Sequence, residues 1–174
     1  MNIFLLDQNN AKPVAKLMTE IKPEWWPSFS DAYDQITSID SSIGTVGWLM
    51  GDTETQPSGW VLCRELKCYN AIELECCGYN DDGVFYLEHK LEPLFNRIIE
   101  YAKEKGFTLF RTGMSSVDFN IDGQPIEDIS TAIATLSSQR IDYQWLLEYG
   151  FRVIGIHPNA YGNNRHLILL GRHI

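Results

Sequence analysis

The stretch from Asp142 to Ile156, DYQWLLEYGFRVIGI, predicts a helix, its end and a strand within fifteen residues. Tyr143 and Leu146 recur at the spacing of one helical face, and Gly150 supplies the left-handed position at which helices commonly end. A mostly buried strand follows, with its apolar positions at Phe151, Val153, Ile154 and Ile156. The fold is therefore expected to close with a helix that turns directly into a strand.

The composition is that of a folded globular protein. The chain has 174 residues, of which 44% are hydrophobic and 12% aromatic, which suits one domain spanning residues 1–174. The longest apolar runs, Ile3 to Leu6 and Leu167 to Leu170, fall far below the roughly 20 residues that cross a bilayer. The first residues carry no basic leader before Asp7. We therefore expect a cytoplasmic protein without a membrane partner.

The charge is strongly acidic, with 14 basic residues against 23 acidic ones and a formal net charge of −9. Such a surface repels phosphate backbones, so we expect no nucleic-acid partner. It suits a cationic amine substrate, and it equally serves plain solubility. The charge alone does not choose between these two interpretations.

The four cysteines are Cys63, Cys68, Cys76 and Cys77. No group of cysteines and histidines has the spacing of a zinc site, so no metal is expected. A hairpin turning near residues 69–70 would place Cys63 opposite Cys76, but a cytosolic address favours reduced, buried thiols over a disulfide.

Alternation and periodicity predict the remaining elements. Strands are expected at residues 3–6, 45–50, 59–68, 71–78, 108–112, 151–156 and 166–170, and helices at 9–21, 31–39 and 91–105. Asn10 and Ser30 are the expected caps of the first two helices, and Gly106 is the expected stop of the third. A short helix is also expected between residues 126 and 136, inside a long polar segment covering 115–138. A segment of that length favours a lid or a binding loop.

The predicted strand at 71–78 carries the most suggestive pattern. Its acidic residues, Glu73 and Glu75, are expected on one face. Its apolar residues are expected on the other face, at Ile72, Leu74 and Cys76.

This order of elements, together with the helix–Gly150–Phe151–strand unit, resembles the GCN5-related N-acetyltransferase (GNAT) superfamily across the whole chain. Ala71–Gly78 matches its fourth strand, Leu91–Gly106 its central helix and Asn163–Ile174 its last strand. The resemblance implies an α/β fold with a mixed, mainly antiparallel sheet of about seven strands and helices on both faces. It also implies a coenzyme cleft where the fourth and fifth strands splay, acetyl-CoA as donor, and a small-molecule or peptide amine as acceptor.

In this superfamily the fourth strand leads into a Gln/Arg-x-x-Gly-x-Gly/Ala loop that cradles the coenzyme pyrophosphate. The matching stretch here, Tyr86 to Leu91, contains no glycine. The resemblance implies that the pantetheine arm meets the backbone of Cys76, Cys77 and Gly78. It implies that the pyrophosphate faces Glu88, His89, Lys90 and Leu91. Among these, the negative charge of Glu88 opposes phosphate binding, and the two basic residues offset it.

The catalytic groups of the resemblance fall in two places. The family's tyrosine acid aligns with Leu146, which has no proton to donate, so Tyr143 one turn earlier is the candidate, with Tyr149 and Tyr161 also nearby in sequence. The candidate base is Glu75 or Glu73. The ordinary alternatives are a packing role for Tyr143 and a solvated strand face, with Arg64 opposite Glu75 as an ion pair.

Two functional interpretations therefore stand side by side. The first is an acetyl-CoA-dependent N-acetyltransferase, and the second is a binding module of the same fold that has lost the coenzyme. A homodimer in which a partner chain completes the site is a third possibility. Trp25 and Trp26, which lie between two prolines, fit either a substrate groove or a hydrophobic anchor.

Overall fold

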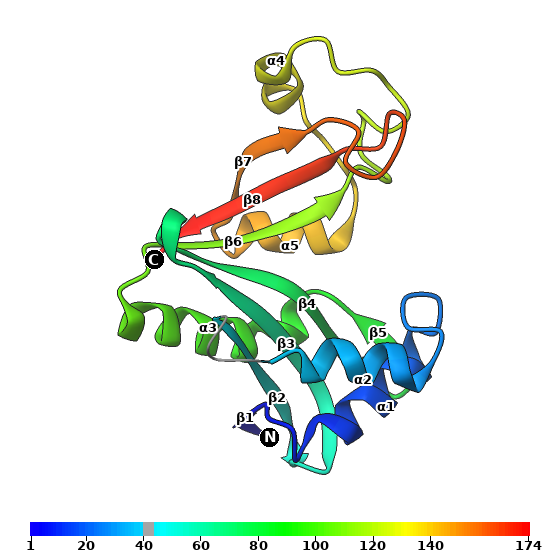
Figure 1. Ribbon diagram of the computed structural model, residues 1–174. Coiled ribbons are helices and arrows are strands. Elements are labelled where there is room, and N and C mark those ends of the chain that lie inside the picture. Colours follow the sequence, from blue (N-terminus) through cyan, green and yellow to red (C-terminus); the bar gives the residue numbers. More distant parts are fainter. Residues whose placement is uncertain (40–43) are drawn as a thin grey trace.

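One mixed sheet organises the computed structural model, which describes residues 1–39 and 44–174 (Figure 1). Its seven-strand order is β1 (Asn2–Leu5), β2 (Thr45–Thr53), β3 (Gln56–Leu66), β4 (Ala71–Asp81), β6 (Leu109–Ser115), β8 (Leu167–His173) and β7 (Arg152–His157). These neighbours pair antiparallel, except that β4 and β6 are parallel. The predicted sheet is confirmed. A short extra strand, β5 (Val84–Tyr86), pairs with β4 across a turn at residues 82–83.

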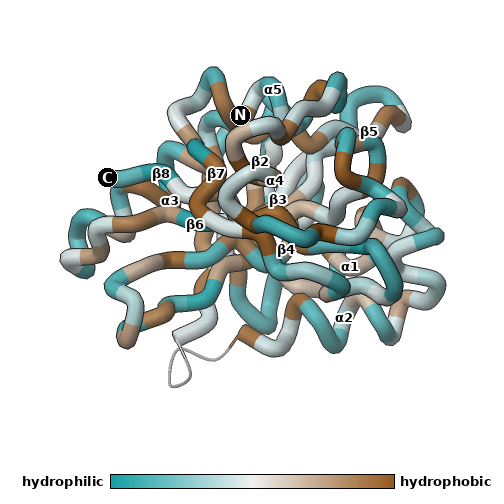
Figure 2. Tube along the Cα trace, turned by 90° about the horizontal axis from the view of Figure 1, so that it is seen from above, coloured by the Kyte–Doolittle hydropathy of each residue, from teal (hydrophilic) through white to brown (hydrophobic). Residues whose placement is uncertain are grey.

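Helices cover both faces of this sheet, as predicted. One face carries α1 (Ala11–Ile21) and α2 (Phe29–Thr37), and the other carries α3 (Glu92–Lys105) and α5 (Ile141–Glu148). The long segment after β6 holds α4 (Ile129–Ala134), and single 3₁₀ turns precede β4 (Lys67–Tyr69) and α3 (His89–Leu91). Each face has its own hydrophobic core. In Figure 2 the hydrophobic segments gather around the central strands, whereas much of the periphery is hydrophilic.

The Gly150–Phe151 junction forms as predicted. Gly150 has a φ of +96°, and its amide donates to the carbonyl of Leu147 at 3.1 Å. The Phe151 amide donates to the Leu146 carbonyl at 2.9 Å, which closes the helix end. The Phe151 ring is fully buried and lies 5.1 Å from the ring of Phe110. The turn thus places the Phe151 ring in the hydrophobic core beneath α3.

The strand after this junction differs from the prediction at Ile154, which is 46% exposed. β7 is the outer strand of the sheet, and its register with β8 shifts between Val153 and Gly155. An edge strand with a bulge has one side free of the core, so an apolar residue there need not be buried.

The ends of several elements also differ from prediction. Asn10 occupies the N-cap position of α1, but its side chain holds the preceding turn instead, accepting from the Asp7 amide and donating to the Leu5 carbonyl at 2.9 Å each. The cap of α2 is Ser28 rather than Ser30, because the Ser28 hydroxyl accepts from the Asp31 amide at 3.2 Å. β2 continues past Met50 to Thr53 through a register shift.

None of the helices in the described ranges is both long enough and apolar enough to cross a membrane. The charged residues of α3, for example, recur along its outer side, while Leu94, Phe95, Ile98, Ile99 and Ala102 form its buried side.

Truncation of Phe151 tests the anchoring role of the junction. We expect Phe151→Ala to lower the free energy of unfolding by about 3–5 kcal/mol, because it leaves a cavity among packed aromatic rings. The matched control is Ile154→Ala in the same strand, which should cost about 1 kcal/mol or less because Ile154 is half exposed. Urea denaturation measures both, and equal losses would contradict the proposed anchor.

Candidate functional site

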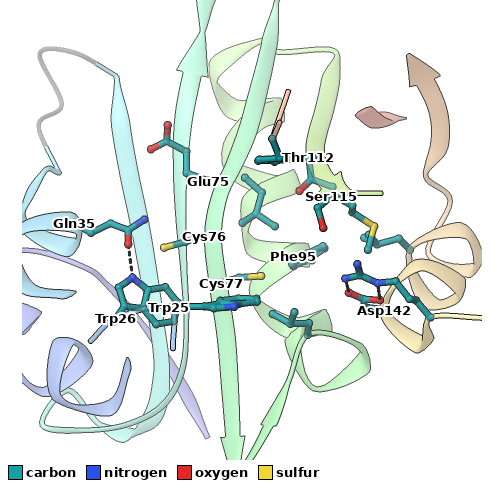
Figure 3. Close-up of a pocket in the computed structure, with 17 residues that line it drawn as sticks. Trp25, Trp26, Gln35, Glu75, Cys76, Cys77, Phe95, Thr112, Ser115 and Asp142 are labelled. Carbon is teal, nitrogen blue, oxygen red and sulfur yellow. Dashed lines mark hydrogen bonds and ion pairs between the residues drawn. The ribbon is translucent and has the colours of Figure 1, made fainter. Parts of the chain in front are cut away.

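The site begins where β4 and β6 separate. The two parallel strands pair at three positions, Ala71 with Leu109, Ile72 with Phe110 and Glu73 with Arg111. Beyond these pairs, β4 stays with β3 while β6 stays with β8. The gap is a cavity of about 510 Å³, with residues 74–77 on one wall and 112–115 on the other (Figure 3). That volume is in the range of small-molecule sites.

A β-bulge at Glu75 accompanies the separation. In the β3–β4 ladder Leu62 pairs with Cys76 and Cys63 with Leu74, so the register passes over Glu75. The Glu75 residue as a whole is exposed, although its side chain is only 23% exposed. Its main chain therefore contributes to the exposed surface. The bulge therefore opens the backbone of β4 at the cavity. Bulges of this kind are frequent beside active sites.

The bulge also changes which face the following residues occupy. Leu74 and Cys77 belong to the core beneath α3, whereas Cys76 packs against the core beneath α1 and α2. The prediction that Leu74 and Cys76 share a face is wrong, because the extra residue between them inverts the alternation. Cys63 likewise lies opposite Leu74 rather than Cys76. All four cysteines are free thiols.

The cavity consequently reaches both sides of the sheet. Its lining on the α3 side includes Leu74, Cys77, Phe95, Met114 and Leu146. Its lining on the α1–α2 side includes Trp25, Trp26, Gln35, Glu75 and Cys76. One ligand can therefore lie in the gap on one side of the sheet while a second ligand reaches it from the opposite side.

The two predicted acidic residues have different surroundings. The Arg111 guanidinium donates to both carboxylate oxygens of Glu73, at 3.1 and 3.2 Å, and Glu73 is not part of the cavity lining. Glu75 lines the cavity and pairs with Arg64, at 2.5 Å between Oε1 and Nη2. The predicted Arg64–Glu75 ion pair is confirmed, although the backbone partner of Arg64 is Glu73.

The pKa of the Glu75 carboxyl is raised. Burial is the largest cause, Arg64 opposes it, and the nearby negative charge of Glu73 adds to it. A carboxylate that is partly desolvated, anchored at one oxygen and open to a cavity has the properties of a general base.

The fold is similar to the folds of several solved structures. No family model matches the sequence, and no curated protein matches it. The aminoglycoside 6'-N-acetyltransferase from Enterococcus faecium has a similar structure, with a TM-score of 0.78 at 14% identity over 99% of this chain and 97% of that one. An aminoglycoside 6'-N-acetyltransferase complexed with coenzyme A gives the same values. The ribosomal-protein-S18-alanine N-acetyltransferase from Escherichia coli has a TM-score of 0.66 at 10% identity, over 99% and 93% of the two chains. The chain has the GNAT fold.

Leu146, at the position where the GNAT resemblance implies a tyrosine, lines the cavity. Tyr143 is buried, its ring lies 4.8 Å from that of Phe119, burial raises its pKa, and it is not part of the cavity lining among the described residues. Tyr149 donates to the Asn96 side chain at 2.6 Å, also outside that lining. Tyr161, 55% exposed, does line the cavity.

The coenzyme-binding positions expected from the GNAT resemblance separate into two groups. Cys76 and Cys77 line the cavity, and Gly78 follows them, buried in β4. Residues 89–91 form the 3₁₀ turn before α3, Glu88 directly precedes it, and none of these four residues lines the cavity. Within that turn, Lys90 pairs with Asp81 at 2.9 Å, and the Leu91 amide donates to the Glu88 carbonyl at 2.7 Å.

An ion pair in the cavity wall escaped the sequence analysis. Arg140 donates to both carboxylate oxygens of Asp142, at 3.0 and 2.6 Å, and to the Val117 carbonyl at 3.2 Å. The Asp142 pairing raises the pKa of Arg140. The sequence Arg-x-Asp at the start of α5 could have suggested this ion pair, but it does not show that both side chains face a cavity. Thr112, Gly113 and Ser115 were missed as well, because no sequence pattern shows where parallel strands part.

The described residues contain no group of three or more histidine, cysteine, aspartate or glutamate side chains placed to hold a metal ion.

Thiol reactivity tests the environment of β4. Burial raises the pKa of Cys76 to about 12 and that of Cys77 further, and it also raises the pKa of Cys63, whereas Cys68 is exposed. Because the thiolate is the reactive form, we expect Cys68 to react quickly with Ellman's reagent at pH 8. Cys76 and Cys77, which are half-buried in the cavity wall and have raised pKa values, should react slowly in the folded protein, and the buried Cys63 should react only on unfolding. Cys68→Ser should remove the fast phase. A fast phase that survives in this variant would contradict the assigned burial.

Proposed function

We propose that the protein is an acyl-CoA-dependent N-acyltransferase that transfers an acetyl group to a primary amine. The observation that carries the proposal is Glu75, a carboxylate with a raised pKa on a β-bulge, facing a cavity that reaches both sides of the sheet. The similarity to acetyltransferase structures, one of them complexed with coenzyme A, supports the same assignment.

The cavity fits the donor along β4. The open main chain at the bulge and the following residues, Cys76 to Gly78, would hold the amide groups of a pantetheine arm, and the apolar wall of Leu87, Phe95 and Leu146 would cover its thioester end. Acetyl-CoA supplies the acyl group as a thioester when it is bound. The pyrophosphate would then face the turn before α3, where Lys90, which is paired with Asp81, supplies a positive charge and the His89 ring supplies a hydrogen-bond donor.

Glu75 would remove a proton from the ammonium form of the acceptor, directly or through a water molecule. The neutral nitrogen would then attack the carbonyl carbon. The C–N bond would form, the C–S bond would break, and the nitrogen would lose its second proton to solvent, which leaves a neutral amide. The departing sulfur needs a proton. Tyr161 lines the cavity and is the tyrosine we favour as its donor, while the Tyr143 hydroxyl would need a path out of the core. In this proposal Tyr143 has a packing role, and loss of activity in Tyr161→Phe but not in Tyr143→Phe is the expected result.

A second candidate, a binding module without catalysis, is favoured by Leu146 and by the turn at residues 88–91, where no glycine cradle exists. Calorimetric titration with acetyl-CoA separates the two. Micromolar binding supports the acyltransferase, and no binding up to millimolar concentration contradicts it.

Substitution of the two glutamates tests the base. We expect Glu75→Gln to lower kcat for amine acetylation by about 10²- to 10⁴-fold while acetyl-CoA binding is kept, because the amide cannot accept the proton. The matched control is Glu73→Gln, two residues away but paired with Arg111 outside the cavity, which should retain most of the activity. Equal losses in both variants would contradict a specific role for Glu75.

The pH dependence gives an independent test. A general base works in its ionised form, so the rate should fall as the pH is lowered through the pKa of Glu75, which lies above the ordinary value of 4.5. Arg64 lowers that pKa, so Arg64→Gln should raise it and move the acid limb of kcat/KM to higher pH. A limb that stays in place, or moves to lower pH, would contradict Glu75 as the titrating group.

A further inference from the structure

We propose, resting on the acyltransferase function above, that the acceptor is a small primary alkylamine that carries one aromatic ring and one ammonium group. It would lie on the α1–α2 side of the cavity, with its ring against Trp25 and Trp26 and its nitrogen at Glu75. The proposal depends on the aromatic character, the charge and the size of this part of the cavity.

The aromatic wall is built and held in place. Trp26 is 6% exposed, packs edge to face on Trp60 with a centroid distance of 5.7 Å, and donates its indole N–H to the Gln35 side chain. Trp25 meets Trp26 at a centroid distance of 5.7 Å, also edge to face, is 52% exposed and lines the cavity. Two indole rings, one fixed in the core and one accessible, form a surface suited to stacking with a flat ring.

The charges on this side suit one ammonium group and no more. Glu75 is the acidic side chain in this part of the lining, and Arg64 already holds one of its oxygens. Gln35 and Cys76 are the other polar groups there. The ammonium of Lys22 lies 5.2 Å from the centroid of the Trp25 ring. Lys22 is itself paired with Glu24, so the Glu24 carboxylate is already engaged there. An acceptor with several positive charges would find one carboxylate in this part of the lining, whereas a single ammonium is neutralised at Glu75.

The size of the cavity points the same way. The whole gap is about 510 Å³, and the thioester end of the donor must share it. A one-ring amine is small enough to share this cavity with the donor.

Acetylation of a small panel tests the proposal in the intact protein. Coenzyme release with acetyl-CoA is measured for 2-phenylethylamine, spermidine, kanamycin and a peptide with a free N-terminus. We expect kcat/KM to be at least tenfold higher for 2-phenylethylamine than for the other three. Preferred acetylation of spermidine, kanamycin or the peptide would overturn the assignment of a ring-bearing alkylamine as acceptor and leave the acyltransferase function intact.

Variants of Trp25 locate the ring. We expect Trp25→Ala to raise the KM for 2-phenylethylamine about tenfold, with the KM for acetyl-CoA unchanged, and Trp25→Phe to restore most of the loss. The control is Phe29→Ala, another partly exposed aromatic, which lies outside this cavity lining. An unchanged KM in Trp25→Ala would contradict the proposal.

Direct titration separates failure of this inference from failure of the proposed function. Binding of 2-phenylethylamine that weakens in Trp25→Ala, in a protein that does not bind acetyl-CoA, would support the amine site and sink the acyltransferase. Binding of acetyl-CoA without binding or acetylation of 2-phenylethylamine would support the acyltransferase function and contradict the proposed amine site.

Discussion

The rest of the site depends on one constraint, the parting of two parallel strands after three residue pairs. β4 keeps its partner β3 and β6 keeps its partner β8, so each side of the gap is held by an antiparallel ladder of its own. The bulge at Glu75 adds a residue to β4 at this point, and a bulge bends and twists the strand that contains it. Backbone that would have bonded across the sheet becomes available to a ligand.

The gap also joins two hydrophobic cores that the sheet otherwise keeps apart. Phe95 belongs to an aromatic group beneath α3, with Phe110 at 5.3 Å and Trp145 at 5.0 Å. Trp26 and Trp60 belong to the core beneath α1 and α2. Rigid aromatic packing on both sides allows the gap to stay open without collapse, since the walls are fixed by contacts behind them. The proposed reaction uses this arrangement, with the donor on one side and the acceptor on the other.

Much of the fold could be predicted because local chemistry determines it. The left-handed glycine at Gly150, the buried Phe151 and the periodic face of α3 are each visible in a short window of sequence. The site was harder to predict. Alternation along β4 placed Cys76 with Leu74, because a bulge is a property of the pairing between strands and leaves no mark in one of them. Glu75 was identified through the family resemblance, and the structure distinguishes it from Glu73.

Hydrogen–deuterium exchange of the backbone amides of residues 74–78, with and without acetyl-CoA, is the decisive measurement. We expect acetyl-CoA to slow exchange at these amides, because the main chain opened by the bulge is where the donor binds. Slower exchange elsewhere with no change at residues 74–78, or no change anywhere at saturating acetyl-CoA, would contradict it.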